Sequence, residues 1–462
     1  MSDIVDALLA ALGPEVVAAG PDIDPRYRCD WSALGAAPPL ALIRPRRTAE
    51  VATTLRLCHE AGQPVVPQGG LTGLAGGATP RLGDIALSLE RMSGVEEIDP
   101  AAATITLLAG TPLQAAQAAA AATGFLLALD LGARGSCQIG GNLSTNAGGN
   151  RVIRYGMARE QVLGLEVVLA DGTVVASLNK MLKNNAGYDI KQLFIGAEGT
   201  LGVITRAVLR MHPRPLSQAT ALVALPDYEA VVRLLRHAQA TLGEISAFEA
   251  MWGGFYDFIA NHPTTARKPL PDGRPFYALI EFSGSDPAGD AARFEALLEA
   301  AMANGVILDA VLAQSERDAR DFWIIREGAP IDSFPLVMNF DVSLPITGIG
   351  EFAARCRAGL DARWPQALKL FYGHIGDSNL HISVMMESRG SEAEVPAVMH
   401  AVDAVVYEAV RAMAGSVSAE HGIGTLKRGW LGYSRSEAEL ALMRLLKQSL
   451  DPKGILNPGK VI

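Results

Sequence analysis

Two glycine-rich runs constrain the fold of this chain more than any other feature of its sequence. The first run, residues 67–77, holds five glycines in eleven residues and follows a short strand-like segment, residues 64–66. The second run covers residues 132–149 and consists largely of glycine and small polar residues. Glycine lacks the side chain that would keep a ligand away from backbone N–H groups. The two runs therefore predict loops that can surround a phosphate-bearing ligand.

The size and composition of the chain indicate a globular protein of two or three domains. Its 462 residues are 49% apolar and 19% charged, without a long low-complexity stretch. The net charge of −9 argues against a nucleic-acid partner, which requires clustered basic residues. The longest apolar stretch, residues 118–129, falls well short of the roughly 20 residues of a membrane span, so we expect no span.

The cysteines and the N-terminus together predict a cytoplasmic protein. The sequence has four scattered cysteines without a C-x-x-C pair: Cys29, Cys58, Cys137 and Cys356. This arrangement indicates neither a disulfide framework nor a thiolate zinc site, and reduced thiols are the expectation. The N-terminus also lacks the basic start and apolar stretch of a secretory signal.

Local patterns mix helices with strands and predict an α+β fold. A helix is expected from Arg47 to Gly62 and another over residues 437–450. Asp171-Gly172 separates two strand-like segments and predicts a hairpin. The sequence His-Pro-Arg-Pro at residues 212–215 breaks the pattern, so we place a domain boundary near residue 215.

Three of the eight histidines lie in two motifs near the C-terminus. G-H-I-G-D-S-N-L-H holds His374 and His381, and A-E-H-G-I-G holds Glu420 and His421. On a continuous strand the first two histidines would point to opposite faces, but residues 376–379 favour a turn that can bring them together. Two imidazoles and the Glu420 carboxylate form a three-ligand set typical of a catalytic metal site. His421 cannot easily share the direction of its neighbour, and we expect it to act as a base.

The glycine-rich runs, together with I-G-A-E-G-T-L-G-V-I at residues 195–204, resemble the FAD-binding domain of the vanillyl-alcohol-oxidase-like flavoenzymes. Residues 130–141 and 187–194 are most similar to the D-2-hydroxyglutarate and D-lactate dehydrogenase branch. The resemblance extends from about residue 40 to the end of the chain. It implies a two-part FAD-binding domain of the vanillyl-alcohol-oxidase/PCMH type in residues 1–215 and an α+β substrate-binding domain with an antiparallel sheet in residues 216–417. Residues 418–462 would return to the FAD and the active site.

The resemblance also implies which residues contact FAD. The first run contains no histidine or cysteine that could attach the flavin, so non-covalent binding is expected. The implied contact residues are Pro67, Gln68, Gly69, Gly70, Leu71, Thr72, Gly73, Gly76, Gly77, Gly135, Ser136, Gly140, Gly141, Asn142, Thr145, Asn146, Gly148, Gly149, Glu198, Gly199, Gly202, Val203, Ile204 and Asn457.

Substrate recognition is expected from one arginine and two positions that depart from the family pattern. F-W-I-I-R places Arg326 where the family has the arginine that pairs with the substrate carboxylate. Asn339 stands where hydroxyglutarate-type enzymes usually have lysine, and Ser383 stands where they usually have asparagine. A second substrate carboxylate would lose a cationic partner, so D-2-hydroxyglutarate itself is in doubt.

The expected reaction is the oxidation of a D-2-hydroxy acid to the 2-oxo acid. His421 would take the hydroxyl proton and hydride would pass to FAD, while a divalent metal on His374, His381 and Glu420 assists. Zinc is expected, with Mn²⁺ and Fe²⁺ as alternatives. An electron-transfer flavoprotein, a cytochrome or a quinone would reoxidise the flavin, and a homodimer is left open.

Three other functions compete with this interpretation. The nearest is an oxidase of the same fold that passes electrons to oxygen. A metal-dependent hydrolase could use the same histidines, but the glycine runs would then have no purpose. A non-catalytic FAD-binding module would not need the His/His/Glu/His set. An NAD-binding Rossmann domain is not indicated, because G-x-G-x-x-G is absent from the sequence.

Overall fold

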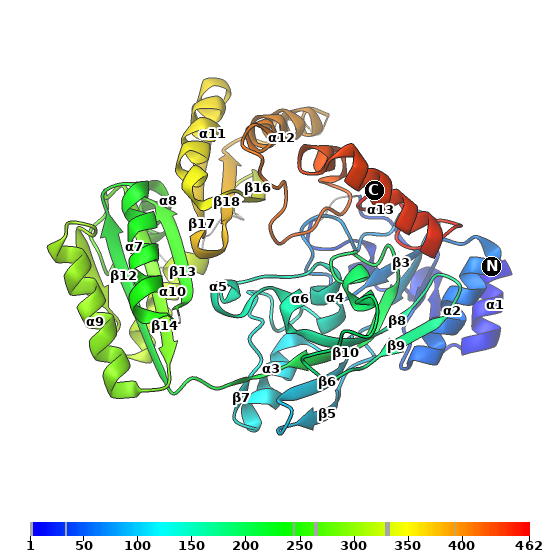
Figure 1. The fold of residues 1–462 in the computed structure, drawn as a ribbon. Helices are drawn as coiled ribbons and strands as arrows, with labels where there is room; N and C mark the ends of the chain where they lie inside the picture. Colours follow the sequence, from blue (N-terminus) through cyan, green and yellow to red (C-terminus); the bar gives the residue numbers. More distant parts are fainter. Residues whose placement is uncertain (1–2, 33–34, 244, 263–266, 329–332, 392) are drawn as a thin grey trace. The chain divides into compact units, whose positions relative to one another are not determined.

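The computed structural model describes residues 3–32, 35–243, 245–262, 267–328, 333–391 and 393–462. The chain forms two compact units (Figure 1). Unit 1 contains residues 1–149, 155–214 and 420–462, and unit 2 contains residues 150–154 and 215–419. The sequence had suggested boundaries at 215 and 417, without the short excursion at residues 150–154.

Unit 1 contains two main sheets and a two-stranded ribbon. The first sheet has the order β1-β2-β4-β3, with β2, β4 and β3 parallel, and the second is antiparallel with the order β5-β6-β10-β8-β9. The strands are β1 (Val17–Ala19), β2 (Ala41–Ile43), β3 (Val65–Gln68), β4 (Ile85–Ser88), β5 (Val95–Asp99), β6 (Thr104–Leu108), β8 (Val162–Val168), β9 (Val174–Ser177), β10 (Val203–Arg210), and the ribbon β7 (Phe125–Leu126) with β11 (His212–Pro213).

The helices of unit 1 share one apolar core with both main sheets. That core draws on the end of the chain as well, because Ile455 and Leu456 are buried in it and Leu456 bridges to Val65 of β3. The helices are α1 (Asp3–Leu12), α2 (Thr48–Ala61), α3 (Leu113–Ala122), α4 (Ile139–Ser144), α6 (Ala158–Gln161) and α13 (Glu437–Leu450), and α5 (Val152–Tyr155) lies where the chain passes between units.

Several local predictions for unit 1 are confirmed. Helix α2 ends at Gly62, which adopts the left-handed conformation with φ 66°. Asp171-Gly172 joins β8 and β9 in an antiparallel hairpin. Helix α13 covers the predicted residues 437–450, and its start is stabilised by a capping box in which Ser436 and Glu439 bond each other's backbone N–H groups. Residues 125–129 have the composition of a strand, but β7 ends at Leu126.

Unit 2 is built on one antiparallel sheet, which confirms the fold expected for the substrate-binding domain. The strand order is β15-β12-β14-β13-β17-β18-β16. The strands are β12 (Ser217–Leu225), β13 (Ile245–Trp252), β14 (Phe276–Gly284), β15 (Asp309–Leu312), β16 (Leu336–Ser343), β17 (Leu368–His374) and β18 (Asn379–Met386).

Helices cover the two faces of this sheet. Phe294 of α9 stacks on Phe282 of β14 on one face. On the other face, α8 and α10 bury an apolar cluster against β12, β14, β13 and β17. The helices are α7 (Tyr228–Leu242), α8 (Gly253–Ala260), α9 (Pro287–Ala303), α10 (Glu316–Glu327), α11 (Ile349–Arg363) and α12 (Val395–Ala412). None of the helices within the described ranges is long and apolar enough to cross a bilayer.

Candidate active site

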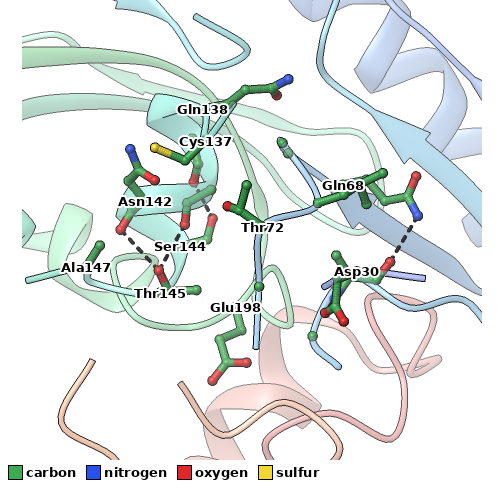
Figure 2. A pocket seen from close by; sticks show the side chains of 18 of the residues that line it. Asp30, Gln68, Thr72, Cys137, Gln138, Asn142, Ser144, Thr145, Ala147 and Glu198 are labelled. Carbon is green, nitrogen blue, oxygen red and sulfur yellow. Dashed lines mark hydrogen bonds between the residues drawn. The ribbon is translucent and has the colours of Figure 1, made fainter. Parts of the chain in front are cut away.

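A cavity of about 370 Å³ in unit 1 lies between the two glycine-rich runs. Figure 2 shows Gln138, Asn142 and Thr145 of the second run on one side, Gln68 and Asp30 on the other, and Thr72 between them. Further lining comes from Glu198, Gly199, Val203 and Ile204, and from Glu420 and His421 in the C-terminal segment. A cavity of this size is typical of small-molecule sites.

The glycines let the two runs approach more closely than side chains would permit. A Cβ at Gly70 would lie 2.0 Å from the carbonyl oxygen of Ser136, and a Cβ at Gly140 would lie 2.7 Å from the Cβ of Ala109. Glycine at position 70 therefore lets the two runs approach each other, and glycine at position 140 lets the second run pack against Ala109. The glycines that predicted a ligand-binding loop therefore also allow the close packing that forms the wall of the cavity.

Most of the residues implied to contact FAD line this cavity, and the others lie outside its lining. Those in the lining are Pro67, Gln68, Gly69, Gly70, Leu71, Thr72, Gly73, Gly77, Gly140, Gly141, Asn142, Thr145, Gly148, Glu198, Gly199, Val203 and Ile204. Those outside it are Gly76, Gly135, Ser136, Asn146, Gly149, Gly202 and Asn457.

The sequence reasoning did not single out several of the lining residues, among them Asp30, Trp31 and Gln138. Asp30 and Trp31 precede the first glycine run, and no motif marks them. Asp30 is buried and accepts hydrogen bonds from the backbone of Ala78 and from the hydroxyl of Ser32, so it fixes the loop around the first run. Gln138 begins α4 within the second run, where its position next to the glycines was a usable signal.

The polar atoms of the cavity fit a ligand with hydrogen-bonding groups. The side-chain oxygens of Gln68 and Gln138 are buried and have no hydrogen-bond partner among the residues that the structure describes. A buried amide oxygen without a partner costs about 1–3 kcal/mol. A polar ligand such as FAD would supply the missing donors, so the residues present fit this cofactor.

Glu198 fixes the C-terminal segment at the cavity. Its carboxylate accepts hydrogen bonds from the backbone N–H groups of Ile423 and Gly424 at 2.7 and 2.9 Å. Burial raises the pKa of Glu198, and these two N–H donors oppose that rise. Glu198 itself has a left-handed backbone with φ 50°, a strained conformation for a non-glycine residue. Its predicted role as a cofactor contact therefore gains a second part, which is to hold the segment that carries His421.

The two histidines of G-H-I-G-D-S-N-L-H meet in unit 2, as the turn in that motif predicted. His374 ends β17, a short turn follows, and β18 carries His381. The turn closes at Ser378, which is left-handed with φ 75°. The two imidazole rings lie 5.2 Å apart between centroids and nearly perpendicular.

Strand register gathers polar side chains on one face of the sheet. Glu249 of β13 pairs with His374, Tyr372 pairs with His381, and His381 pairs with Asp341 of β16. This is the face whose apolar part packs under α8 and α10. The Nδ1 atom of His381 lies 4.0 Å from a carboxylate oxygen of Asp341. One sheet face thus combines a histidine pair with two buried carboxylates.

Arg326 reaches this face from α10. The residue is buried, with an exposed fraction of only 5%. The Nε atom donates to Glu249 Oε2 at 2.8 Å, and the guanidinium lies over the ring of Tyr372 at 4.8 Å. Burial alone would raise the pKa of Glu249, but His374 and Arg326 outweigh that effect and lower it. The arrangement keeps a guanidinium beside the histidine pair.

Asn339 and Ser383 are direct neighbours on the same sheet face. They pair across β16 and β18, and the Ser383 hydroxyl donates to the Asn339 side-chain oxygen at 2.8 Å. Ser383 lies two residues beyond His381 on β18, so both side chains point to one side. The two positions singled out as departures from the family pattern thus form one contact.

Comparisons with known proteins agree with this arrangement. Residues 39–177 match the family described as FAD binding domain, and residues 214–461 match FAD linked oxidases, C-terminal domain. A mitochondrial D-2-hydroxyglutarate dehydrogenase of Bos taurus is 43% identical over 94% of this chain and 78% of its own. A D-2-hydroxyglutarate dehydrogenase of Xanthomonas citri pv. viticola is 39% identical over 94% of this chain and 92% of its own. This chain belongs to the FAD-linked D-2-hydroxy acid dehydrogenase family.

More distant structures share the fold of the FAD-linked D-2-hydroxy acid dehydrogenases. p-Cresol methylhydroxylase superposes with a TM-score of 0.78 over 99% of this chain and 96% of its own, at 16% identity. Alkyldihydroxyacetonephosphate synthase reaches a TM-score of 0.76 over 99% of this chain and 85% of its own, also at 16% identity. These likenesses confirm the vanillyl-alcohol-oxidase type of FAD-binding fold and the mixed α+β class.

Proposed function

We propose that this FAD-linked dehydrogenase oxidises D-2-hydroxy acids to 2-oxo acids, and that D-2-hydroxyglutarate is one of several substrates. The observation that carries the proposal is the buried Arg326 beside His374 and His381 on one sheet face. A cation next to a metal-binding or proton-accepting pair matches a substrate that bears a carboxylate next to a hydroxyl group. The relatives named as D-2-hydroxyglutarate dehydrogenases support this substrate class.

Arg326 would bind the carboxylate of the substrate. Its Nη2 atom is buried and has no hydrogen-bond partner within the described part of the chain. A buried charged donor without a partner is costly, and a carboxylate would supply the acceptor. A carboxylate bound to Arg326 would hold the α-carbon of the substrate in a fixed orientation. Fixing the orientation of the reacting groups in this way accelerates a reaction.

His421 would remove the proton of the substrate hydroxyl. It lines the same cavity as the glycine-rich runs, and the grip of Glu198 on residues 423 and 424 restrains the backbone next to it. A positioned base typically contributes 10²–10⁴-fold to a rate. Non-covalently bound FAD would accept the hydride from the α-carbon.

His374, His381 and Glu420 would hold a divalent metal, and zinc suits two imidazoles and one carboxylate with open positions. The chain connection supports Glu420 as the third ligand. Ala419, the last residue of unit 2, donates its N–H to Asp341 Oδ2 at 3.1 Å, and Asp341 pairs with His381. Glu420 directly follows Ala419 in the chain, and Ala419 is hydrogen-bonded to the residue that pairs with His381. The metal would act as a Lewis acid toward the substrate oxygens.

The Asn339–Ser383 contact would face the side chain of the substrate. The amide of Asn339 and the hydroxyl of Ser383 already bond each other. They would therefore offset the desolvation cost of a second substrate carboxylate less than a lysine would. We therefore propose that uncharged D-2-hydroxy monocarboxylates rival D-2-hydroxyglutarate as substrates.

Anaerobic bleaching of the flavin tests this function directly. D-2-hydroxy acids should reduce the flavin, and their L-enantiomers should not. Chelation of the metal should stop the reduction without releasing FAD. The substitution His421→Ala should slow reduction at least ~10²-fold, whereas His237→Ala, on the exposed side of α7, should leave it unchanged. Equal reduction by both enantiomers, or full activity after removal of the metal, would contradict the proposal.

The remaining features are proposals as well. An electron-transfer flavoprotein, a cytochrome or a quinone would reoxidise the flavin, and the name of the C-terminal family, FAD linked oxidases, keeps oxygen as the competing acceptor. Rapid reoxidation of the reduced enzyme in air would favour the oxidase. The four free cysteines favour a reducing compartment, for which we propose the cytoplasm. A homodimer is proposed as the assembly.

A further inference from the structure

Glu249 is a fully buried carboxylate that no sequence motif identified. It lies on β13, is 0% exposed, and uses both oxygens. Oε1 accepts from His374 Nδ1 at 2.6 Å and Oε2 accepts from Arg326 Nε at 2.8 Å. An isolated buried carboxylate is strongly unfavourable, so this one requires both partners. It connects two side chains that serve different parts of the proposed reaction.

The first contact fixes the state of His374. A carboxylate only accepts hydrogen bonds, so the Nδ1 atom of His374 must carry the proton. The lone pair of a neutral imidazole then resides on Nε2, so Nε2 is the ring atom that can coordinate a metal. Carboxylates in this position orient metal-binding histidines and increase their basicity. Glu249 and His374 are register partners on adjacent strands, and the hydrogen bond between them restrains rotation of the imidazole ring.

The second contact fixes the orientation of Arg326. Glu249 takes the Nε–H group, and the ring of Tyr372 lies against the guanidinium at 4.8 Å. These two contacts define both the plane and the direction of the guanidinium. They leave Nη2, which has no hydrogen-bond partner among the described residues, for an incoming carboxylate. Without Glu249, Arg326 could rotate about its flexible stem.

We propose that Glu249 is a positioning residue that sets His374 for the metal and Arg326 for the substrate carboxylate at the same time. The proposal rests on the proposed function, in which His374 and Arg326 have these two tasks. A glutamine cannot replace Glu249, because an amide has one acceptor atom and its NH₂ group would face one of the two donors. Loss of Glu249 should therefore weaken two properties together, although the residue touches neither ligand.

The test compares Glu249→Gln with Glu281→Gln. Glu281 is a buried glutamate on the adjacent strand β14 and bonds Ser246 and Trp323, so it is matched in burial and charge. Competitive titration of each metal-depleted protein with Zn²⁺ should give a Kd about 10–100-fold weaker for Glu249→Gln than for wild type. Bound Co²⁺ should show an altered absorption spectrum in Glu249→Gln. Flavin reduction should show a raised KM for the hydroxy acid and a lowered kcat. Glu281→Gln should keep the wild-type Zn²⁺ affinity, Co²⁺ spectrum and KM.

Glu249→Asp provides a second variant if the glutamine protein does not fold. Aspartate keeps the charge but is one methylene shorter, so it should retain part of the Zn²⁺ affinity and still alter the Co²⁺ spectrum. Zn²⁺ affinity, Co²⁺ spectrum and KM that match Glu281→Gln in every folded Glu249 variant would overturn the positioning role. A wild-type enzyme that binds no Zn²⁺ or does not reduce its flavin with D-2-hydroxy acids would instead refute the proposed function.

Discussion

Gly70→Ala should destabilise unit 1 through a collision between two backbone segments. The added Cβ would lie 2.0 Å from the carbonyl oxygen of Ser136 and 2.9 Å from the Cα of Cys137, whereas ordinary contact begins near 3.4 Å. Neither obstacle is the end of a flexible side chain, so one glycine-rich run must move. Overpacking of this kind costs about 1–3 kcal/mol. For a unit of this size we expect a fall in Tm of roughly 2–12 °C.

Gly69→Ala is the matched control, because the two glycines are adjacent and the substitution is the same. A Cβ at Gly69 would meet Gly141 Cα at 3.4 Å, which is an ordinary contact. Thermal unfolding should be followed by circular dichroism, first for the FAD-stripped proteins and then with excess FAD. The collision involves protein atoms only, so the Gly70→Ala deficit should appear without FAD. Equal Tm values for the two stripped variants would refute the packing argument.

Three further predictions concern the cofactor, the substrate and the thiols. The purified protein should be yellow and should release intact FAD on acid precipitation; flavin that stays with the pellet would contradict non-covalent binding. Asn339→Lys should raise kcat/KM for D-2-hydroxyglutarate relative to an uncharged monocarboxylate by ~10-fold, the equivalent of about 1.4 kcal/mol, and an unchanged ratio would place the distal carboxylate elsewhere. Burial raises the pKa of Cys58 and Cys356 to about 12 and also raises that of Cys137, so these thiols stay protonated at pH 8. Ellman's reagent should therefore modify only Cys29 in the native protein, and Cys29→Ser should abolish the reaction. A second fast-reacting thiol would contradict this prediction.

Features that depend on neighbouring residues were predictable from the sequence. The turn between His374 and His381, the hairpin at Asp171-Gly172 and the stop of α2 at Gly62 each rest on a few adjacent residues. The glycine-rich runs likewise carry their own signal, since close backbone approach needs glycine whatever the rest of the fold.

Contacts that depend on strand order could not be predicted in the same way. Glu249 meets His374 only because β13 pairs with β17, although β14, β15 and β16 lie between them in sequence. Glu198 meets residues 423 and 424 across more than two hundred residues of chain. Nothing in the local sequence around a glutamate indicates such a partner. The sheet topology has to be known first.

The return of the C-terminal segment to unit 1 has a consequence for the order in which the protein is made. Ile455 and Leu456 belong to the core of unit 1, and Glu420 and His421 line its cavity, yet a ribosome synthesises all four after the whole of unit 2. Unit 2 includes only residues 150–154 from before its main segment, so its whole sheet is synthesised before the C-terminal segment. Until the C-terminal segment is synthesised, the N-terminal part of unit 1 lacks these four residues in its core and in the lining of its cavity. We therefore expect FAD to be captured late in biogenesis, and chains that stop early should be released without the cofactor.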